Sequence, residues 1–477
     1  PLYTRAKELV TKTGFTGNNP YSAYPRKERI KFTIQVKDDV TGTYVPKTAY
    51  LDMIQVRRIE NPKGVWRSAG KSDNFHVTLM RLPYDNAEDF KPFNSEGAWR
   101  ATIIDGGDDF ITLRSTVEGS GSDNVQQTGV KSIEGAGEHP IDFWIDFKGT
   151  IPEGATPRCA IVRVRYHNYT CEHDIFVRQG YAPITINGNA ESNNNPAWTS
   201  YNVYRFDANN APVYTKSPLE EGSLFRRGNR TAILASNNDR SGFTFGVEPT
   251  GSFNVLEFGS ATTSQKTWSQ LAPSTDDVTN RFKEWSIAGD HERIATIEDF
   301  YTLESTSIHS NINKAYGVLY GDGATETQKS VKEAFGYDHN EDPTNSKKGM
   351  RGCFVFNVNN SRNIFFPIGK SGYGRRKGMT SNGEKVGTLR YAQRTDYYNN
   401  DGTGNIQYVP LFYDLFERSG AIYQCRNRLE STNNEVKNSS AFDINYFTMG
   451  FEGFENGASN NNNGSDSDAC FIRTVKY

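Results

Sequence analysis

The chain has 477 residues and a formal net charge of −2, with 54 Lys and Arg residues against 56 Asp and Glu residues. This length predicts about two to four domains, and the balanced charge gives no electrostatic reason to expect a nucleic acid or a membrane surface as partner. Hydrophobic residues make up only 35% of the chain, while 43 Gly and 25 Tyr are present. That composition is typical of a loop-rich, all-β surface protein and less so of a helical cytosolic enzyme.

The first residues show no pattern of secondary structure. Residues 1–25 are interrupted by glycines and prolines, so we interpret them as a leader or an exchanged segment. The first 18 of them lack the apolar core of a signal peptide, and no run of about 18 apolar residues occurs, so we expect no transmembrane segment. Because the chain begins with Pro1 instead of Met, we expect a processed or truncated chain, from which an export or lipoprotein leader has been removed.

Strand-like alternation of apolar and polar residues begins at Arg29. We expect the apolar residues of this first strand to form one buried face; they are Ile30, Phe32, Ile34 and Val36. Further strands are predicted at 50–56, 75–79 and 143–147, and turn clusters at 38–42 and 61–64 separate the first three strands.

The clearest hairpin joins residues 159–166 to residues 171–177. With its turn centred on His167 and Asn168, Cys159 would face Phe176 and Cys171 would face Val164. The two cysteines would then not lie opposite each other, which argues against a disulfide bond between them.

The chain contains five cysteines, so at least one is free or pairs with another chain. They are Cys159, Cys171, Cys353, Cys425 and Cys470. None is part of a CxxC motif, which argues against a zinc site. Two alternatives stay open for the rest, namely buried apolar thiols or a disulfide bond among the last three cysteines, whose connectivity the sequence does not give.

A polar stretch rich in Asn, Gly and Pro at residues 187–197 is the best linker candidate. It would separate a β-sandwich region, residues 26–186, from a module at residues 198–477. The first region forms either one sandwich or two halves, 26–105 and 106–186.

Two short helices are predicted in the second region. The first follows Thr296 as N-cap, with Asp299 as the acid of a capping box. The second would span residues 326–335, after the Gly-Asp-Gly turn at 321–323.

Two segments of the N-terminal region resemble β-sandwich modules of Bacteroidota surface proteins. One is Arg158-Cys159-Ala160-Ile161-Val162-Arg163-Val164, and the other is Ile175-Phe176-Val177-Arg178-Gln179-Gly180. The second resembles the Val-x-Gln-x-Gly-like end of the last strand in that family. The resemblance covers about residues 105–182.

The C-terminal region carries motifs in an order that resembles the C-type-lectin-like or formylglycine-generating-enzyme-like fold. They are Arg293-Ile294-Ala295-Thr296-Ile297-Glu298-Asp299-Phe300, Phe365-Phe366-Pro367-Ile368-Gly369 with Gly372-Tyr373, and Asp468-Ala469-Cys470-Phe471-Ile472-Arg473-Thr474-Val475. Ala295 stands where that family usually has Pro, and Asp299 where it has Glu. The implied fold class is mostly β, with an N-terminal β-sandwich region followed by a C-type-lectin-like α+β module.

Taken together, the two regions resemble a Bacteroidota fimbrillin-associated, type V pilus surface protein. The resemblance implies an exported lipoprotein, a pilus subunit or a tip adhesin at the cell surface or outer membrane. Its partners would be other pilus subunits, which in this family assemble by donor-strand exchange, and a host or microbial glycan or protein.

No catalytic motif supports an enzyme, because the chain has no Gly-x-Ser-x-Gly, His-Glu-x-x-His or P-loop sequence. His167 and His173 flank the hairpin turn, but two nitrogens are few for copper or zinc. Loops at 397–402 and 460–466 offer oxygen ligands without an EF-hand register. We therefore expect no catalytic residues, no metal site and no cofactor, with calcium at one of these loops as the alternative.

The predicted binding surface is a loop region rich in Tyr and Arg, the residue types enriched at binding hot spots. Its candidate residues are Tyr373, Arg375, Arg376, Tyr391, Arg394, Tyr397 and Tyr398; packing beneath their own loop is the structural alternative. Three functions follow as hypotheses: a tip adhesin that binds through these residues, a structural or anchoring pilus subunit, and an enzyme built on the lectin-like scaffold. We favour the first.

Overall fold

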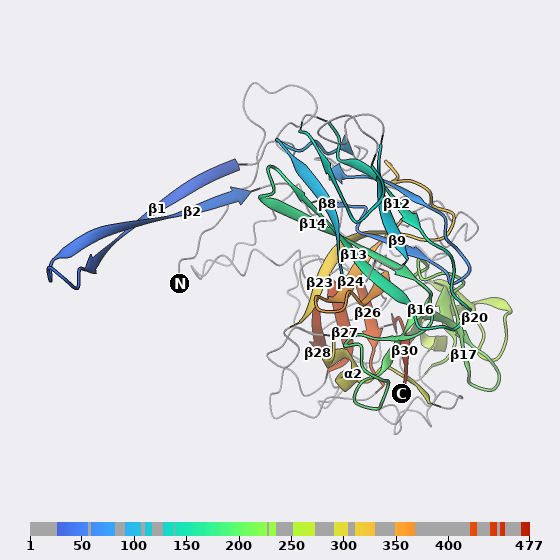
Figure 1. Cartoon of the computed structure of the whole chain (residues 1–477). Helices are drawn as coiled ribbons and strands as arrows, with labels where there is room; N and C mark the ends of the chain where they lie inside the picture. The colour runs from blue at the N-terminus through green and yellow to red at the C-terminus, as the bar shows by residue number, and fades with distance from the viewer. Residues whose placement is uncertain are drawn as a thin grey trace.

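The chain is mostly β, as expected from the sequence, and the described part contains one α-helix. The computed structural model describes residues 26–55, 59–81, 91–105, 110–116, 127–137, 139–226, 229–234, 251–271, 291–303, 311–329, 349–367, 420–426, 439–445, 449–453 and 469–477. Figure 1 shows several sheets gathered into one body, from which the hairpin of β1 (Arg26–Lys37) and β2 (Tyr44–Gln55) projects.

The largest sheet has eight strands and draws on both predicted regions. Its order is β11 (Ser132–Gly135), β8 (Trp99–Asp105), β13 (Arg158–Tyr166), β14 (Cys171–Gln179), β4 (Gly64–Arg67), β23 (Ile312–Tyr320), β24 (Met350–Asn357) and β25 (Asn363–Pro367). β4 lies parallel to both β14 and β23, while the other neighbours are antiparallel. The division at residues 187–197 stays a prediction, but strands from both sides of it share this sheet.

The predicted hairpin at 159–177 is present as β13 and β14, with a register that differs from our prediction by two residues. Cys159 lies opposite Arg178 and Cys171 opposite Tyr166, because four residues, 167–170, form the turn. A shift of two leaves every side chain on its expected face. The expectation that the two cysteines do not oppose each other is confirmed.

A second sheet packs against the first. It has the order β10 (Thr128–Val130), β9 (Ile111–Ser115), β12 (Asp142–Phe147) and β5 (Phe75–Thr78). Burial alternates strictly along β12, as expected for a strand with one core face. Trp99 of β8 contacts Phe143 of β12 across the gap, with ring centroids 6.1 Å apart.

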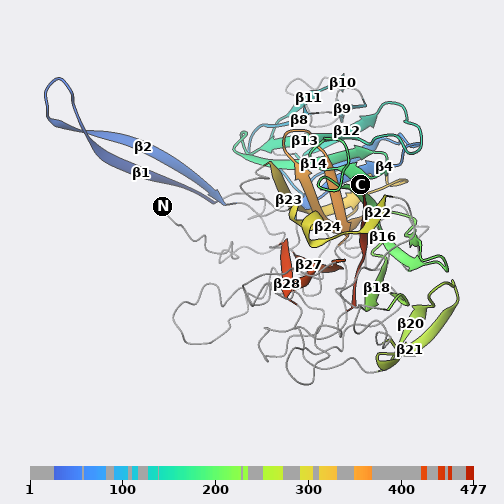
Figure 2. The same cartoon turned by 90° about the horizontal axis from the view of Figure 1, so that it is seen from below.

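The remaining described strands form smaller sheets around the C-terminal part. The first has the order β15 (Ile184–Thr185), β16 (Ala197–Phe206), β30 (Arg473–Lys476) and β22 (Glu292–Ile294), with β17 (Pro212–Tyr214) beside β16. The second has the order β21 (Thr263–Thr267), β20 (Ser252–Leu256), β19 (Ala232–Leu234), β18 (Ser223–Arg226) and β29 (Ala469–Cys470). Two three-stranded sheets complete the set: one has β26 (Gly420–Gln424), β27 (Ser439–Asn445) and β28 (Met449–Gly453), and the other has β3 (Ile59–Asn61), β6 (Met80–Arg81) and β7 (Lys91–Pro92). Figure 2 shows the C-terminus close to β22 and β16, so the closing motif completes a sheet begun about 270 residues earlier.

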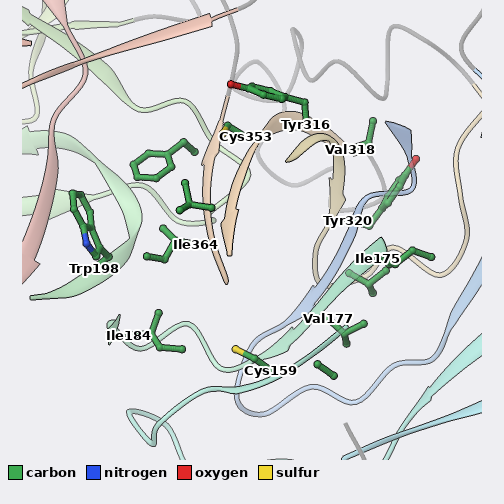
Figure 3. Packing of buried hydrophobic residues seen from close by; sticks show 14 of the residues in the cluster. Cys159, Ile175, Val177, Ile184, Trp198, Tyr316, Val318, Tyr320, Cys353 and Ile364 are labelled. Carbon is green, nitrogen blue, oxygen red and sulfur yellow. The ribbon is translucent and has the colours of Figure 1, made fainter. Parts of the chain in front are cut away.

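One hydrophobic core joins the two predicted regions. Cys159 of β13 and Ile184 of β15 belong to the same cluster as Trp198, Cys353 and Ile364, which follow the predicted linker in sequence (Figure 3). All five side chains are buried. Because interiors are close-packed, the two parts are expected to resist separation.

The first predicted helix is confirmed as α2 (Ile297–Tyr301). Thr296 is its N-cap, the Thr296 side chain accepts from the backbone N–H of Asp299, and the Asp299 carboxylate accepts from the backbone N–H of Thr296. The second predicted helix is wrong at its start, because Glu326 forms a parallel β-bridge with His76. The hydroxyl of the next residue, Thr327, accepts from the Thr78 backbone N–H. This segment therefore lies along the edge of a sheet. Residues 330–335 of the prediction lie outside the described residues.

Two arginines of the predicted motifs are fully buried and bind backbone carbonyls. Arg178 donates to the carbonyl oxygen of Asn363 at 3.0 Å and to the hydroxyl of Ser200 at 2.9 Å. Arg473 donates to the carbonyl oxygens of Thr199 at 2.7 Å and of Phe365 at 3.1 Å. Burial lowers the pKa of Arg178 to about 10, so it stays charged at neutral pH. Both arginines therefore connect segments that are distant in the sequence.

Among the described residues, no helix is long and apolar enough to cross a membrane.

Candidate functional site: the projecting hairpin

The seven residues predicted to form the binding surface lie outside the described residues. They are Tyr373, Arg375, Arg376, Tyr391, Arg394, Tyr397 and Tyr398. The alternative calcium loops at 397–402 and 460–466 also lie outside, so both proposals stay predictions. The candidate site must therefore come from the rest of the molecule.

The hairpin of β1 and β2 is the clearest exposed feature of the described chain. Each strand has 12 residues, about twice the usual length of a strand. The two strands form a two-stranded sheet of their own, and both views show it extending away from the body (Figures 1 and 2).

One face of the hairpin is apolar between Ile30 and Val36 of β1 and the residues opposite them in β2. The antiparallel register places Ile30 opposite Leu51, Phe32 opposite Ala49, Ile34 opposite Lys47 and Val36 opposite Val45. Because directly opposite residues share a face, seven apolar side chains line this stretch, and within it only Lys47 is polar. We call this surface the apolar face; it consists of Ile30, Phe32, Ile34, Val36, Val45, Ala49 and Leu51.

The apolar face is exposed, and this corrects the sequence analysis. The alternation in β1 predicted a buried face, but Phe32 is 38% exposed, Ile34 61% and Leu51 47%. No described side chain of the hairpin is buried. The alternation predicted the strand correctly, but it does not specify what covers the apolar side. That cover is absent from the described part of this chain.

The opposite face of the hairpin is polar and aromatic. Lys31 lies opposite Tyr50, Thr33 opposite Thr48, and Lys37 opposite Tyr44. The Arg29 guanidinium lies over the Tyr50 ring, 5.6 Å from its centroid, an arrangement that stabilises the pair modestly at an exposed site. The two faces therefore differ in chemistry, so the hairpin has a defined orientation for binding.

Asp38 shapes the turn at the tip. Its Oδ1 accepts from the backbone N–H of Val40 at 3.0 Å and of Thr41 at 2.8 Å, and from the Thr41 hydroxyl at 3.0 Å. These bonds to the ionised carboxylate hold the pKa of Asp38 below its ordinary value of 3.8. Gly42 takes the left-handed backbone conformation that closes the turn, with φ of 70°. The two strands are therefore held in register from the tip.

The strands are basic while the tip is acidic. β1 and β2 together contain six Lys and Arg residues and two acidic residues, whereas the turn carries Asp38 and Asp39. The basic residues are Arg26, Lys27, Arg29, Lys31, Lys37 and Lys47. The hairpin thus combines an apolar surface with an excess of positive charge, within a chain whose net charge is −2.

A second polar surface lies on the four-stranded sheet of β10, β9, β12 and β5 but offers little to a ligand. Trp144 of β12 lies between Arg114 of β9 and His76 of β5. The imidazole stacks on the indole at 4.6 Å, and the guanidinium lies 4.6 Å from the indole centroid. Asp146 and Asp142 in turn bind Arg114 and His76. The indole faces are covered, so no flat surface is left for a sugar ring.

His167 and His173 have structural roles. His167 is buried, and its Nδ1 accepts from the backbone N–H of Glu96 at 2.8 Å. His173 is also buried, and its Nε2 lies 2.7 Å from the carbonyl oxygen of Pro62. The described residues contain no group of three or more His, Cys, Asp or Glu side chains arranged to hold a metal ion.

No disulfide bond joins any of the five cysteines, all of which lie in the described residues, so the alternative of a disulfide bond among the last three is not observed. Four are buried and Cys171 is half-buried. Burial raises the pKa of the Cys159 thiol, which keeps it protonated and unreactive.

The sequence matches no protein-family model and no curated protein. The fimbrial assignment therefore rests on the motifs quoted above, and it stays a prediction.

Proposed function

We propose that this protein is a non-enzymatic component of a fimbrial surface structure and that the β1–β2 hairpin is the arm by which it joins a neighbouring protein. The motif order of the sequence supports the fimbrial class. The exposed apolar face supports the arm, and it is the observation that carries this proposal.

The physical argument starts from the stability of the hairpin. An isolated two-stranded hairpin is marginally stable in water, and three strands or a packed face are normally needed. Contiguous exposed apolar surface on a soluble protein marks an interaction site. An arm with seven apolar residues on one face therefore gains most when another molecule covers that face.

This arrangement favours the structural or anchoring subunit over the tip adhesin among the functions expected from the sequence. A contact arm with a continuous apolar stretch on one face suits a lasting contact with another protein, since stable interfaces have apolar cores. The adhesin hypothesis depends on Tyr397 and its neighbours, which lie outside the described residues. Export, a lipid anchor and an outer-membrane location belong to the same proposal.

The test compares two double variants of the full chain in the cells that produce it. Phe32→Ser with Ile34→Ser removes the centre of the apolar face, and Thr33→Ser with Gln35→Ser changes the opposite face of the same strand. We expect the parent and the second variant in the surface fraction that contains pili, and the first variant to be exported but missing from that fraction. Equal incorporation of both variants would refute the arm, and absence of the parent would refute the fimbrial function.

A further inference from the structure

We infer that the polar face of the hairpin binds a linear polysaccharide that carries widely spaced carboxylate groups. The polar face consists of Lys31, Thr33, Gln35 and Lys37 of β1 with Tyr44, Pro46, Thr48 and Tyr50 of β2. It points away from the apolar face, because successive side chains of a strand alternate between its two sides. The inference therefore goes beyond the proposed function, since a neighbouring protein that covers the apolar face leaves the polar face open.

Two exposed lysines give the polar face its positive charge. Lys31 and Lys37 are exposed, and neither forms an ion pair with a described residue. Nearer the base of the hairpin, the register places Asp52 opposite Arg29, so the formal charges of those two residues offset each other. The two aspartates of the turn lie beyond Lys37 in the chain. The charge complement of this surface is therefore an anion that reaches both lysines.

A tyrosine lies opposite each of these lysines. The register pairs Lys31 with Tyr50 and Lys37 with Tyr44, and the two tyrosines are 60% and 68% exposed. A tyrosine offers a flat apolar ring with a polar hydroxyl at its end, and a sugar ring presents C–H groups together with hydroxyl groups. Each pair thus places a cation beside an aromatic ring, which suits a sugar that carries a carboxylate.

The stretch between the two pairs favours a polymer with few charges along its length. Lys31 and Lys37 are six residues apart, so about 20 Å of strand separates them. A nucleic acid carries a phosphate at about every 3.4 Å of rise along each strand, and several phosphates would lie over this stretch without a cation. Hydroxyl and amide groups can instead hydrogen-bond to sugar hydroxyls. The residues that line the stretch are uncharged: Thr33, Gln35, Pro46 and Thr48.

The division of the hairpin into two faces argues against a lipid surface. An amphipathic element that lies on a bilayer buries its apolar side. Ile34 would then face the lipid, while Lys31 and Lys37 would point away from the headgroups. A linear polysaccharide that lies along the strands contacts both lysine–tyrosine pairs without this conflict.

The test measures binding of the full chain to hyaluronan, which carries a carboxylate on every second sugar, by biolayer interferometry. Lys31→Gln and Lys47→Gln are a matched pair, because each removes one charge from the same hairpin but from opposite faces. We expect saturable binding of the parent and a loss of affinity of about fivefold for Lys31→Gln, with a change within about twofold for Lys47→Gln. Lys31→Arg keeps the charge and should bind like the parent.

The tyrosine contribution is tested in the same assay. Tyr44→Ala should weaken binding about fivefold, while Tyr44→Phe keeps the ring and should stay within about twofold of the parent. Added salt at about 0.5 M should weaken binding of the parent, since exposed charges are screened. Dextran, a polysaccharide without charge, should not bind.

Several results would overturn the inference. They are no saturable binding to hyaluronan, equal losses in Lys31→Gln and Lys47→Gln, equal binding of dextran, or tighter binding to oligothymidylate or to phosphatidylglycerol vesicles than to hyaluronan. The last two ligands would identify a nucleic acid or a membrane as the partner of this face. The proposed function is judged separately, by whether the Phe32→Ser with Ile34→Ser variant reaches the pilus fraction, so either proposal can fail without the other.

Discussion

Ile34 of β1 lies directly opposite Lys47 of β2, at the middle of the apolar face. Ile34 is 61% exposed, although the face around it is lined by apolar residues from both strands. An apolar row of this kind is normally the inner side of a sheet. In this protein it is the outer surface of an arm, and the first prediction tests that difference.

Loss of the exposed apolar side chains is expected to leave the fold intact. Phe32→Ser with Ile34→Ser should change the melting temperature by no more than about 2 °C, because exposed residues contribute little to stability. Phe366→Ala is the contrast, since that ring is buried against Trp198, and it should cost about 3–5 kcal/mol. Thermal and denaturant unfolding measure both. A large loss in the double variant would mean that the face is covered within the chain.

Removal of the Arg178 guanidinium is expected to be strongly destabilising. It donates four hydrogen bonds within the core, so Arg178→Met leaves several buried acceptors unpaired and should cost about 3–5 kcal/mol. Arg165→Met in the neighbouring strand β13 is the control. Arg165 is half-exposed, and its loss should stay within about 0.5 kcal/mol. Equal costs in urea unfolding would contradict the structural role.

The capping box of α2 is expected to contribute through both of its bonds. Thr296→Ala removes the acceptor for the Asp299 backbone N–H and should cost about 1 kcal/mol. Thr296→Ser keeps the hydroxyl and should restore most of that stability. Denaturant unfolding of the two variants measures the difference. No difference between Ala and Ser would show that the cap does not stabilise the helix.

Gly352 is expected to be required where β24 meets β25. A Cβ added there would lie 2.3 Å from the Phe365 ring and 2.4 Å from the Phe366 carbonyl oxygen. Gly352→Ala should therefore cost about 1–3 kcal/mol through overpacking. Gly70→Ala is the control because nothing lies within 4 Å of an added Cβ there; its effect should stay within about 0.5 kcal/mol. The comparison uses melting temperatures.

The turn at the hairpin tip is expected to weaken in acid. The pKa of Asp38 is held below 3.8 by its hydrogen bonds with Thr41 and Val40, so the carboxylate stabilises the turn above that pH. Stability from this group should be lost as the pH falls through the lowered pKa. Amide chemical shifts of Val40 and Thr41 measure the change, and Asp38→Asn should abolish their dependence on this titration. A midpoint above 3.8 in the parent would contradict the geometry.

Local sequence signals predicted the local structure well. The Thr296–Asp299 spacing predicted a capping box that the structure contains, and the alternation at 159–177 predicted a hairpin that is present. The prediction was wrong where pairing with a sheet competed with a local preference for helix. Glu326 was expected to begin a helix, but an open strand edge at His76 binds this segment instead. The register at Cys159 was shifted because turn length, and not composition, sets the pairing.

The sequence by itself determined that this chain is mostly β, because period-2 alternation is local and can be recognised within the sequence of each strand. It also determined which side of β1 is apolar. Only the tertiary structure decided that the two parts of the chain share one sheet and one core, since β4 and β23 are about 250 residues apart and pair through long-range contacts. It alone decided that the apolar side of β1 faces outward, because alternation defines a face whereas burial depends on what the rest of the chain places against it.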